Sequence, residues 1–380
     1  MTRQQVKIQH NQDQMASGKR VLTAGDDPLA SINIQNFKQY KVQIEQYLEA
    51  ITLARNRQNL AETAISQAET LIDNAKNTGL KMVNGALSSS DRQAYQQALK
   101  ALLGQFLDLA NTKDESGNFI FSGTQLNTQP FFRDGAGNVS YVGDDFHRTA
   151  QIAPAVEVQT SDPGNKVFMQ MKNPFGDYEP KYALAEKSSL LLSQATNSDK
   201  ADNARYRVRF STDTLGKLSY QLFQNDKLVA TDTYNPKTGI EWQSLTLRFQ
   251  GDIQPSDEVS LQLQAHFSLF NEFKRGIDFV AKNGSKSTTA AELQQFISKL
   301  SAAFIHMSQM RSVVGNRLNT MDRQEEMHLD YQVVLSRSLS SLEDLDYSKA
   351  VIELNENMLA LKSSQQAFAL VKDLNLFNYI

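Results

Sequence analysis

The sequence contains no cysteine in its 380 residues. That absence excludes disulfide bridges, thiolate metal sites and cysteine nucleophiles. The sequence also lacks an apolar run of about 18 residues, and no basic and then apolar leader follows Met1, which argues against a membrane span and a cleaved secretion signal. A chain without cysteine fits a cytosolic protein or one that is exported unfolded, and export would need a route other than a cleaved leader.

Neither sign of charge is in large excess. The 39 lysines and arginines stand against 42 aspartates and glutamates, which gives a net charge of −3. Nucleic acids and anionic membrane surfaces normally attract proteins with a basic patch, so neither is an expected partner. Hydrophobic residues make up 40% of the chain, which is enough for a core in each of the two or three domains expected from its length.

The sequence does contain helical periodicity toward both ends, from about residue 27 to 84 and from about residue 289 to 380. An apolar seam at a 3.5-residue period faces one side of a helix and must be covered by another helix, usually in a coiled-coil bundle. The first seam consists of Phe37, Tyr40, Ile44, Tyr47, Ile51, Ala54, Gln58, Ala61, Ile65, Ala68, Ile72, Ala75, Gly79 and Met82. The second consists of Leu293, Ile297, Leu300, Phe304, Met307, Arg311, Val314, Leu318, Met321, Glu325, His328, Gln332, Leu335, Leu339 and Leu342. A helix that returns antiparallel to the first is predicted from a shorter seam, which consists of Tyr95, Leu99, Leu102, Phe106 and Leu109.

Capping residues predict where the first helices begin and end. Asp27 before Pro28 is typical of a helix start. Asp26 and Asp27 could also be paired catalytic carboxylates, but two aspartates directly before a proline favour a cap. The first long helix should end near Asn84-Gly85, and the next should begin with a capping box at residues 90–93.

Similar signals divide the second helical region. A break is predicted at Asn283-Gly284, and a capping box at residues 289–292 predicts the restart. After Leu345 the apolar pattern is displaced, which indicates a joint between two helices, and Asp346 is predicted to cap the last one.

Between the helical regions the periodicity changes. Short strands or loops are expected at residues 118–122, 139–142 and 156–159. Apolar and polar residues then alternate regularly between about residues 206 and 263, which predicts half-buried strands. Residues 224–227 lie between two such runs and predict a hairpin turn.

These patterns predict a mainly α fold with a β-rich insert, in which long helices from the two ends of the chain form an antiparallel bundle. Residues 1–26 and 344–380 are predicted to be a terminal helical assembly region. Residues 27–171 and 267–343 are predicted to be a helical bundle domain with a β-hairpin segment. The β-rich outer domain is predicted over residues 172–266.

No catalytic motif is present. The serine-hydrolase elbow, the P-loop and the dinucleotide fingerprint are all absent. Glu325 and His328 form one Glu-x-x-His, but a di-iron bundle needs a second copy and two further carboxylates, so we interpret them as a polar layer in the seam. We expect no enzyme activity, no metal and no cofactor. The alternatives are a bundle enzyme or metal protein built on this pair, and sugar stacking by Trp242 and the tyrosines of the β-rich region.

The last helical stripe has no obvious partner within the chain. It consists of Val351, Leu354, Met358, Leu361 and Phe368. No equally long apolar helix remains at the amino end to cover it, so part of this stripe is expected to bind another chain.

Several motifs, in order along nearly the whole chain, resemble the bacterial flagellin family. Ser-Gly-Lys-Arg-Val-Leu at residues 17–22 and Asp-Asp-Pro at residues 26–28 resemble its amino-terminal signature. Residues 314–319 and the tail through 376–380 resemble its carboxyl-terminal signature. Asn-Phe-Ile-Phe-Ser-Gly-Thr at residues 118–124 resembles a box found in one branch, the hook-associated proteins that join the flagellar hook to the filament. The motif residues are Gly18, Arg20, Asp26, Asp27, Phe121, Ser122, Gly123, Thr124, Asn316 and Arg317.

The resemblance implies a structural protein of the bacterial flagellum that acts outside the cell after type III export without a cleaved signal. It implies terminal helices that pair to line an inner tube, and partners that include the adjacent hook-associated protein, flagellin and further copies of the chain in a ring or helical layer. It also implies an export chaperone on the final helix. A filament-forming flagellin is the alternative. The motif at residue 17 begins earlier than the family leads us to expect, so part of the innermost amino-terminal helix is expected to be missing.

The box at residues 119–124 has two interpretations. It can be packing and turn geometry at the outer edge of the bundle, with Gly123 present because the backbone bends, or it can be a contact surface for a neighbouring subunit. The first is favoured. Replacing Phe121 by Asp should prevent folding in the first case and should block only incorporation in the second.

Overall fold

The computed structural model describes residues 2–83, 88–280 and 286–373, and these residues fall into two compact units. Unit 1 consists of residues 1–52, 151–156 and 321–380, and unit 2 of residues 53–150 and 157–320. The predicted helix end at Asn84-Gly85, the break at Asn283-Gly284 and the tail at residues 376–380 lie outside the described residues. The three-region division expected from the sequence stays a prediction.

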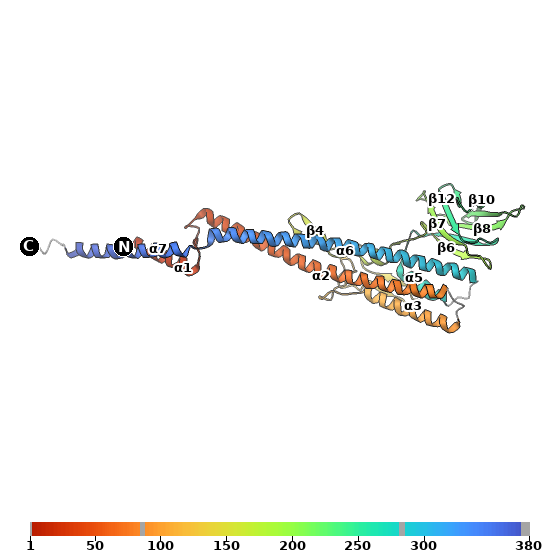
Figure 1. The fold of residues 1–380 in the computed structure, drawn as a ribbon, viewed down its shortest axis with the longest axis horizontal. Coiled ribbons are helices and arrows are strands. Elements are labelled where there is room, and N and C mark those ends of the chain that lie inside the picture. Colours follow the sequence, from red (N-terminus) through yellow and green to blue (C-terminus); the bar gives the residue numbers. More distant parts are fainter. Residues whose placement is uncertain (1, 84–87, 281–285, 374–380) are drawn as a thin grey trace, which may run out of the picture. The chain divides into compact units, whose positions relative to one another are not determined.

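Seven helices occur in the described part of the chain (Figure 1). They are α1 Thr2–Ser17, α2 Pro28–Val83, α3 Ser89–Ala110, α4 Gly164–Phe168, α5 Leu269–Val280, α6 Lys286–Glu343 and α7 Tyr347–Asp373. The two long helices, the intervening α3 and the joint after the second long helix are confirmed. The fold class is therefore confirmed in outline, with long helices toward both ends and an antiparallel β region between them.

Two predicted caps are confirmed. The backbone N–H of Ala30 donates to Asp27 Oδ1 at 3.0 Å at the start of α2, and that of Lys349 donates to Asp346 Oδ1 at 3.1 Å at the start of α7. Each carboxylate accepts a bond from a donor that has no partner within the helix.

Both predicted capping boxes were placed wrongly. The box of α3 is formed by Ser88 and Asp91 instead of residues 90–93. Residues 88–90 are three consecutive serines with the same hydroxyl group. Ser88 forms the box because it lies three residues before Asp91, the spacing at which the two side chains can bond reciprocally to each other's backbone. The predicted box at residues 289–292 lies inside α6, which begins by Lys286.

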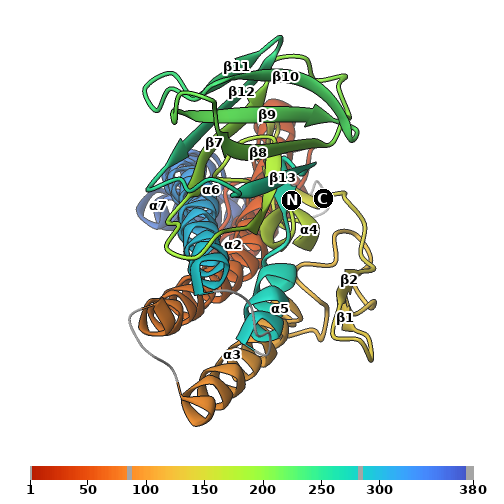
Figure 2. The same ribbon diagram turned by 90° about the vertical axis from the view of Figure 1, so that its right-hand side faces the viewer.

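In unit 2, α2 and α6 run antiparallel. Gly79 of α2 lies against Ile297, since a Cβ at Gly79 would be 3.1 Å from it, whereas Glu69 of α2 pairs with Arg311 at 2.7 Å. Positions along α2 therefore fall as positions along α6 rise. Figure 2 shows these helices beside α3 and α5.

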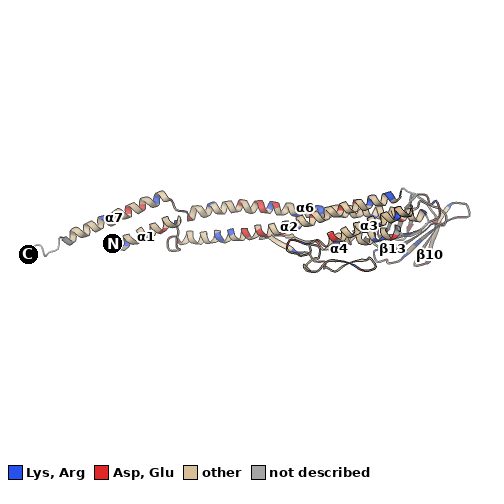
Figure 3. Ribbon diagram, turned by 90° about the horizontal axis from the view of Figure 1, so that it is seen from below, with Lys and Arg blue, Asp and Glu red and all other residues tan. Residues whose placement is uncertain are grey.

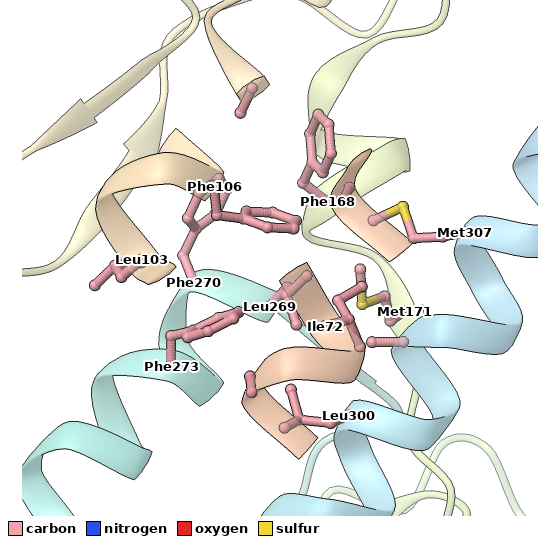
Figure 4. Close-up of a cluster of buried hydrophobic side chains, with 14 of the residues drawn as sticks. Ile72, Leu103, Phe106, Phe168, Met171, Leu269, Phe270, Phe273, Leu300 and Met307 are labelled. Carbon is pink, nitrogen blue, oxygen red and sulfur yellow. The ribbon is translucent and has the colours of Figure 1, made fainter. Parts of the chain in front are cut away.

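Five helices and several short strands contribute to the helical core of unit 2. Figure 4 shows Ile72 from α2, Leu103 and Phe106 from α3, and Leu300 and Met307 from α6 converging with residues of α4, α5 and the strand that follows α4. Four buried aromatic rings form its centre, and they are Phe106, Phe168, Phe270 and Phe273.

The seams are confirmed in their main positions but not throughout. Ile44, Ile51 and Ile72 of the first seam are buried, as are Leu300 and Val314 of the second. Tyr40 and Phe304, which were predicted to be in the seams, are 52% and 41% exposed. A straight α-helix drifts relative to a 3.5-residue repeat, so a strict heptad count brings some positions out of the interface.

The β region contains fourteen described strands in five sheets. The strands outside the outer region are β1 Phe131–Arg133, β2 Val139–Tyr141, β3 Thr149–Ala153, β4 Val156–Gln159, β5 Met171–Lys172 and β14 His266–Phe267. Those between β5 and β14 are β6 Tyr178–Ala183, β7 Leu191–Asn197, β8 Tyr206–Thr212, β9 Leu218–Gln224, β10 Lys227–Thr233, β11 Ile240–Trp242, β12 Leu245–Gln250 and β13 Glu258–Leu263. The pairs β1-β2, β3-β4 and β5-β14 are two-stranded sheets. The predicted segment at residues 118–122 is not a strand.

Two antiparallel sheets enclose a second core in unit 2. Their strand orders are β10-β9-β8-β13-β6 and β11-β12-β7. Phe210 of the first sheet packs edge-on against Phe249 of the second, with ring centroids 5.5 Å apart. The predicted hairpin turn is confirmed, because Gln224 pairs with Lys227 and both residues between them have positive φ.

A buried ion cluster joins β6 to the helices of unit 2. Lys299 of α6 is fully buried, and its Nζ lies 2.5 Å from Glu179 Oε2 and 2.8 Å from Glu272 Oε1. Arg275 of α5 pairs with both carboxylates, and Gln295 also donates to Glu179. Removing one member of such a cluster leaves an uncompensated buried charge, so the cluster fixes how β6 meets α5 and α6.

Candidate assembly site

The predicted motif residues belong to both units. Gly18, Arg20, Asp26 and Asp27 belong to unit 1, as does the stripe on α7, whereas the box and the Asn316-Arg317 pair belong to unit 2.

In unit 1 the segment after α1 pairs with the end of α6, and we call Gly18, Arg20, Glu343 and Leu345 the clasp. The backbone N–H of Arg20 donates to the carbonyl of Glu343 at 2.7 Å, and that of Leu345 donates to the carbonyl of Gly18 at 3.0 Å. Residues more than 300 positions apart are therefore joined by a two-bond antiparallel bridge. The bridge connects the α1–α2 elbow to the α6–α7 joint.

The conformation of Gly18 explains why glycine suits the clasp. Its φ is +70°, and a Cβ there would lie 3.3 Å from the hydroxyl of Tyr347. An L side chain would be strained in this left-handed conformation and would crowd the start of α7. The Tyr347 hydroxyl donates to the carbonyl of Met15 at 3.0 Å, which also ties α7 to α1.

Three basic side chains reinforce the clasp. Lys19 Nζ lies 2.6 Å and Lys38 Nζ 2.9 Å from Glu343 Oε1, and Arg20 Nη2 donates to the carbonyl of Leu342 at 2.9 Å. Burial raises the pKa of Glu343, but the hydrogen bonds and charges of the two lysines outweigh it, so this pKa lies below its usual value. Glu343 is therefore ionised at neutral pH.

Asp26 and Asp27 have structural partners. The backbone N–H groups of Leu22 and Thr23 donate to Asp26 Oδ2 at 2.9 and 2.8 Å, and that of Ala30 donates to Asp27 Oδ1. The bond from Thr23 lowers the pKa of Asp26, and the bond from Ala30 lowers the pKa of Asp27. A general acid needs a raised pKa, so these carboxylates fit the turn and cap roles instead of acid–base catalysis.

Phe121 of the box lies in the aromatic core of unit 2. Its side chain is 1% exposed and packs edge-on against Phe168, with ring centroids 5.0 Å apart. Its carbonyl accepts hydrogen bonds from the Tyr141 hydroxyl at 3.1 Å and from the Gly164 N–H at 2.8 Å. Both the side chain and the carbonyl of Phe121 therefore have their contacts within the chain.

The rest of the box is a turn closed by Asp144. The backbone N–H of Thr124 donates to Asp144 Oδ1 at 2.9 Å, and the Thr124 hydroxyl donates to Oδ2. Gly123 has φ of +72°, and a Cβ there would be 2.0 Å from Asp144 Oδ1. The Ser122 hydroxyl is buried and donates to the carbonyl of Phe119 at 3.1 Å. These contacts favour the packing and turn interpretation of the box.

The surroundings of Asp144 and Tyr141, which bond to the box, determine the ionisation of both side chains. Burial raises the pKa of Asp144, but the hydrogen bonds from Thr124 and from the Phe146 N–H outweigh it, so the pKa lies below its usual value. Burial raises the pKa of the Tyr141 hydroxyl to about 12. At neutral pH the turn is therefore closed by a carboxylate acceptor and a phenol donor.

Arg317 of α6 forms a two-bond ion pair with Asp162, which follows β4. Arg317 Nη1 lies 2.6 Å from Asp162 Oδ2 and Nη2 lies 3.0 Å from Oδ1. Nη2 also donates to Gln159 Oε1 at 3.0 Å. The planar guanidinium suits this paired geometry, and the contact holds the loop after β4 against α6. Asn316 is exposed on the same helical turn.

The stripe on α7 remains largely exposed in unit 1. Val351, Met358 and Phe368 are 41%, 52% and 62% exposed, whereas Leu354 and Leu361 are half-buried. Contacts between α1 and α7 account for partial cover. Because apolar side chains gain by leaving water, this face favours association with another helix.

The Glu325–His328 region is also in unit 1. His328 is buried, its Nε2 lies 2.7 Å from the carbonyl of Ile152, and its ring stacks on Tyr47 with centroids 5.4 Å apart. In the described part of the chain, no three His, Asp or Glu residues are grouped in a way that could hold a metal ion. The contacts of His328 fit the polar-layer interpretation.

The tyrosines of the β region lie in its core. Tyr178, Tyr206 and Tyr234 are buried, and Trp242 packs edge-on against Tyr206 with centroids 6.2 Å apart. Rings that stack on sugars must be accessible, so the burial of these tyrosines argues against the sugar-binding alternative.

Sequence reasoning missed the carboxylates that hold the motifs in place. Glu343 holds Lys19 and Lys38, and Asp162 holds Arg317. The available signal was weak, namely an acidic residue next to a predicted helix joint and an aspartate before a proline. Their partners lie far away in the sequence, where local pattern gives no information.

The long helices are mixed in charge and moderate in hydropathy. Figure 3 shows both signs of charge along α2 and α6. Among the described residues, no helix contains an apolar stretch with the length and hydropathy required to span a bilayer.

Comparison with known proteins first identifies the class of fold. Residues 1–126 match the family model described as the bacterial flagellin N-terminal helical region. Polar flagellin F of Vibrio parahaemolyticus is 21% identical over 385 residues, which covers 96% of this chain and 91% of that protein. The expected resemblance to the flagellin family is confirmed.

Within this class the chain is similar to flagellar hook-associated protein 3. It is 34% identical to the Escherichia coli K12 protein over 156 residues, which covers 41% of this chain and 48% of that protein. The chain therefore spans about half the length of this curated relative. The crystal structure of hook-associated protein 3 from Legionella pneumophila matches with a TM-score of 0.69 and 24% identity, covering 81% of this chain and 98% of that one. The resemblance to this branch is confirmed in sequence and in fold.

Proposed function

We propose that the chain is a structural subunit of the bacterial flagellum that joins the hook to the filament. The observation that carries the proposal is the exposed apolar stripe of α7, in a chain whose sequence and fold both resemble hook-associated protein 3. The role is binding and not catalysis. The carboxylates of the motifs act as caps, turns and ion-pair partners, which supports that assignment.

The proposed assembly uses repeated contacts between identical subunits. A head-to-tail contact that does not close on itself generates a helical layer, on which the next type of subunit can stack. In the proposal the clasp holds α1 and α7 at one end of unit 1, and α7 gains cover from neighbouring copies, a further hook-associated protein and flagellin. The chain would reach this place outside the cell by type III export.

Location on the flagellum tests the proposal. A labelled antibody against the chain, applied to sheared flagella, should mark a single band between the hook and the filament. Labelling along the whole filament would contradict the junction role, and absence from the flagellum would contradict any axial role. Deletion of the gene should leave hooks without filaments, and expression of the wild-type chain should restore the filaments.

A filament-forming flagellin is the second candidate, because the similarity to Vibrio flagellins extends over 96% of the chain. Purified subunits should then polymerise alone into long filaments. A junction subunit should form only short layers under the same conditions. Electron microscopy of concentrated protein distinguishes the two.

We further propose that an export chaperone covers α7 before assembly. Leu354, Met358 and Phe368 are apolar residues of the single helix α7, and apolar side chains of a helix can be recognised in an apolar groove. Deleting residues 354–380 should abolish binding of the chaperone in a pull-down from the native host. Unchanged binding would place the chaperone site elsewhere.

A further inference from the structure

The loop after β2 holds an exposed aromatic side chain on a fixed backbone, and we call residues 142–146 the anchor loop. Phe146 is 70% exposed, and its backbone N–H donates to Asp144 Oδ1 at 3.1 Å. The same carboxylate accepts both the N–H and the hydroxyl of Thr124 in the box. One carboxylate therefore joins the turn of the box to the backbone of Phe146.

Further hydrogen bonds constrain the anchor loop. The Tyr141 hydroxyl donates to the carbonyl of Asp144 at 2.7 Å, and Asn165 of α4 donates to the carboxylate of Asp145. A side chain that is exposed on a constrained backbone needs little further ordering when it binds a partner, which favours binding. Phe146 is therefore suited to act as an anchor in a contact with another molecule.

Two more apolar side chains lie exposed on the same hairpin. Phe132 of β1 is 46% exposed and Val142 is 47% exposed. Phe132 pairs with Ser140 of β2, and Val142 follows Ser140 by two residues, so the two apolar side chains lie on one face of the hairpin. The anchor loop therefore presents an apolar surface and not a single ring.

A groove between α2 and α3 of the same unit has a complementary character. It has a volume of about 650 Å³, and its apolar lining comes from Leu80 of α2 and from Ala98, Ala101 and Leu102 of α3. Among the described residues that line it, Lys81 is the charged one. The small alanines leave room between the helices, and the volume is comparable to that of a pocket for a small ligand. The groove can therefore accept an aromatic ring with an acidic neighbour.

The hairpin and the groove lie on different sides of unit 2. Figure 2 shows the β1–β2 hairpin on the side of α5 that is away from α2. Because the two surfaces differ, a contact between them is heterologous, and it leaves one loop and one groove free for further copies. Such a contact repeats from copy to copy.

We propose that the anchor loop of one copy inserts Phe146 into the α2–α3 groove of a neighbouring copy. Asp145 is exposed directly before Phe146 and would lie near the exposed Lys81 of the neighbour. This opposite charge favours a second copy of the chain as the occupant of the groove. The box acts through this loop, because Thr124 positions Phe146 by way of Asp144 without touching the neighbour. The proposal rests on the proposed function, since it identifies one contact between the subunits.

Sedimentation of the purified full-length chain tests the contact. Phe146→Ser should weaken self-association by about thirtyfold, the effect expected when an anchor side chain is lost. Ala101→Trp, at an exposed position of α3, should have a similar effect because it fills the groove. An equal mixture of the two variants should form dimers more tightly than either variant alone, since one supplies an intact groove and the other an intact loop. A mixture no tighter than the separate variants would overturn the proposal.

The matched control is Leu215→Ser, because Leu215 is 80% exposed between β8 and β9 of the same unit. It should leave self-association unchanged. Thr124→Val tests the positioning role of the box. It should weaken association of the wild type and have no further effect in the Phe146→Ser variant, because Thr124 acts through Phe146. Equal effects in both backgrounds would overturn the positioning role.

Cross-linking in isolated flagella tests the contact in the assembly. The chain has no cysteine, so the double variant Asp145→Cys and Lys81→Cys should give disulfide-linked copies under oxidation, whereas each single variant should give none. A double variant that is present in flagella but stays unlinked would overturn the contact and leave the proposed function intact. Absence of the chain from flagella would instead contradict the proposed function, and the mixture experiment would then decide on the contact.

Discussion

Unit 1 and unit 2 differ in how far their large apolar side chains are buried. Unit 2 encloses two cores, one among its helices and one between its two sheets. In the described part of unit 1, more large apolar side chains are exposed than buried. The exposed ones include Leu29, Tyr331, Val334, Met358, Leu359 and Phe368.

The difference indicates how each unit obtains its stability. Burial of apolar surface contributes about 25 cal/mol per Å², and this contribution is available to unit 2 within one molecule. A pair of helices with few buried side chains gains much less, and short helices without support are marginal in water. Unit 1 should therefore depend on contacts with other chains, whereas unit 2 should fold alone.

The largest change is expected for Phe121→Asp in unit 2. It would place a carboxylate against Phe168 and the other rings of the helical core, where Phe121 is 1% exposed. Loss of a buried phenylalanine alone costs about 3–5 kcal/mol, and an unpaired charge adds to it. Unit 2 should fail to fold, as urea unfolding followed by circular dichroism would show.

Phe146→Asp is the matched control, because Phe146 is 70% exposed in the same unit. Its unfolding midpoint should stay close to that of the wild type. If Phe121→Asp folds normally and fails only in assembly, the box is a contact surface after all.

A somewhat smaller loss of unfolding free energy is expected for Lys299→Met. The change leaves Glu179 and Glu272 buried with one cation fewer, which should destabilise unit 2 by about 3–5 kcal/mol. Lys100→Met, at an exposed position of α3, should change stability by no more than about 0.5 kcal/mol. Urea unfolding of both variants is the measurement.

The same cluster offers a sharper test. The triple variant Glu179→Gln, Glu272→Gln and Lys299→Met removes the lysine and both carboxylates together and leaves only Arg275, whose side chain is 41% exposed, charged. It should recover much of the loss, because neutral replacements avoid the desolvation of buried ions. A triple variant as unstable as the single one would mean that Lys299 acts through shape and not through charge.

In both units, the features set by neighbouring residues were predicted better than the contacts between distant segments. The presence of α2 and α6, the caps at Asp27 and Asp346 and the turn at residues 224–227 depend on neighbours within a few positions, so the sequence contains the necessary information. The misplaced box at Ser88 and Asp91 shows the limit even there, since adjacent serines are equivalent until the fold selects one.

Contacts between distant segments could not be predicted from local sequence patterns. Nothing near Arg317 indicates that Asp162 will hold it, and nothing near Lys19 indicates Glu343. The resemblance identified Arg317 and Arg20 as motif residues without giving their partners. The exposure of α7 was predictable only in general terms, from the shortage of apolar helix at the amino end.

Acid should loosen the clasp of unit 1 more than the wild-type core of unit 2. The pKa of Glu343 is lower in the folded chain than its usual value. Its ion pairs therefore contribute fully above the unfolded pKa of about 4.3 and are lost as pH falls through the lower folded value. Because both lysines are about half exposed, the contribution should be no more than about 1 kcal/mol.

Amide exchange of Arg20 and Leu345 measures this effect, since their N–H groups form the clasp. Protection factors of both should fall in the wild type as the pH drops below the unfolded pKa of about 4.3 and through the lower folded pKa of Glu343. In Glu343→Gln they should be low already at neutral pH and should change little with acid. Equal acid dependence in the variant and the wild type would assign the loosening to other carboxylates.

The smallest change in monomer stability is expected for Phe368→Ser on α7. The side chain is 62% exposed, so its removal should alter the unfolding free energy by no more than about 0.5 kcal/mol. If neighbouring chains bury it, assembly should nevertheless weaken by about 2 kcal/mol per subunit contact, or about thirtyfold in affinity. Gln366→Ser, at an exposed polar position of the same helix, should leave sedimentation of the assembled protein unchanged. A loss of monomer stability without a loss of association would reverse the contrast between the units, because the stripe would then be core within one molecule.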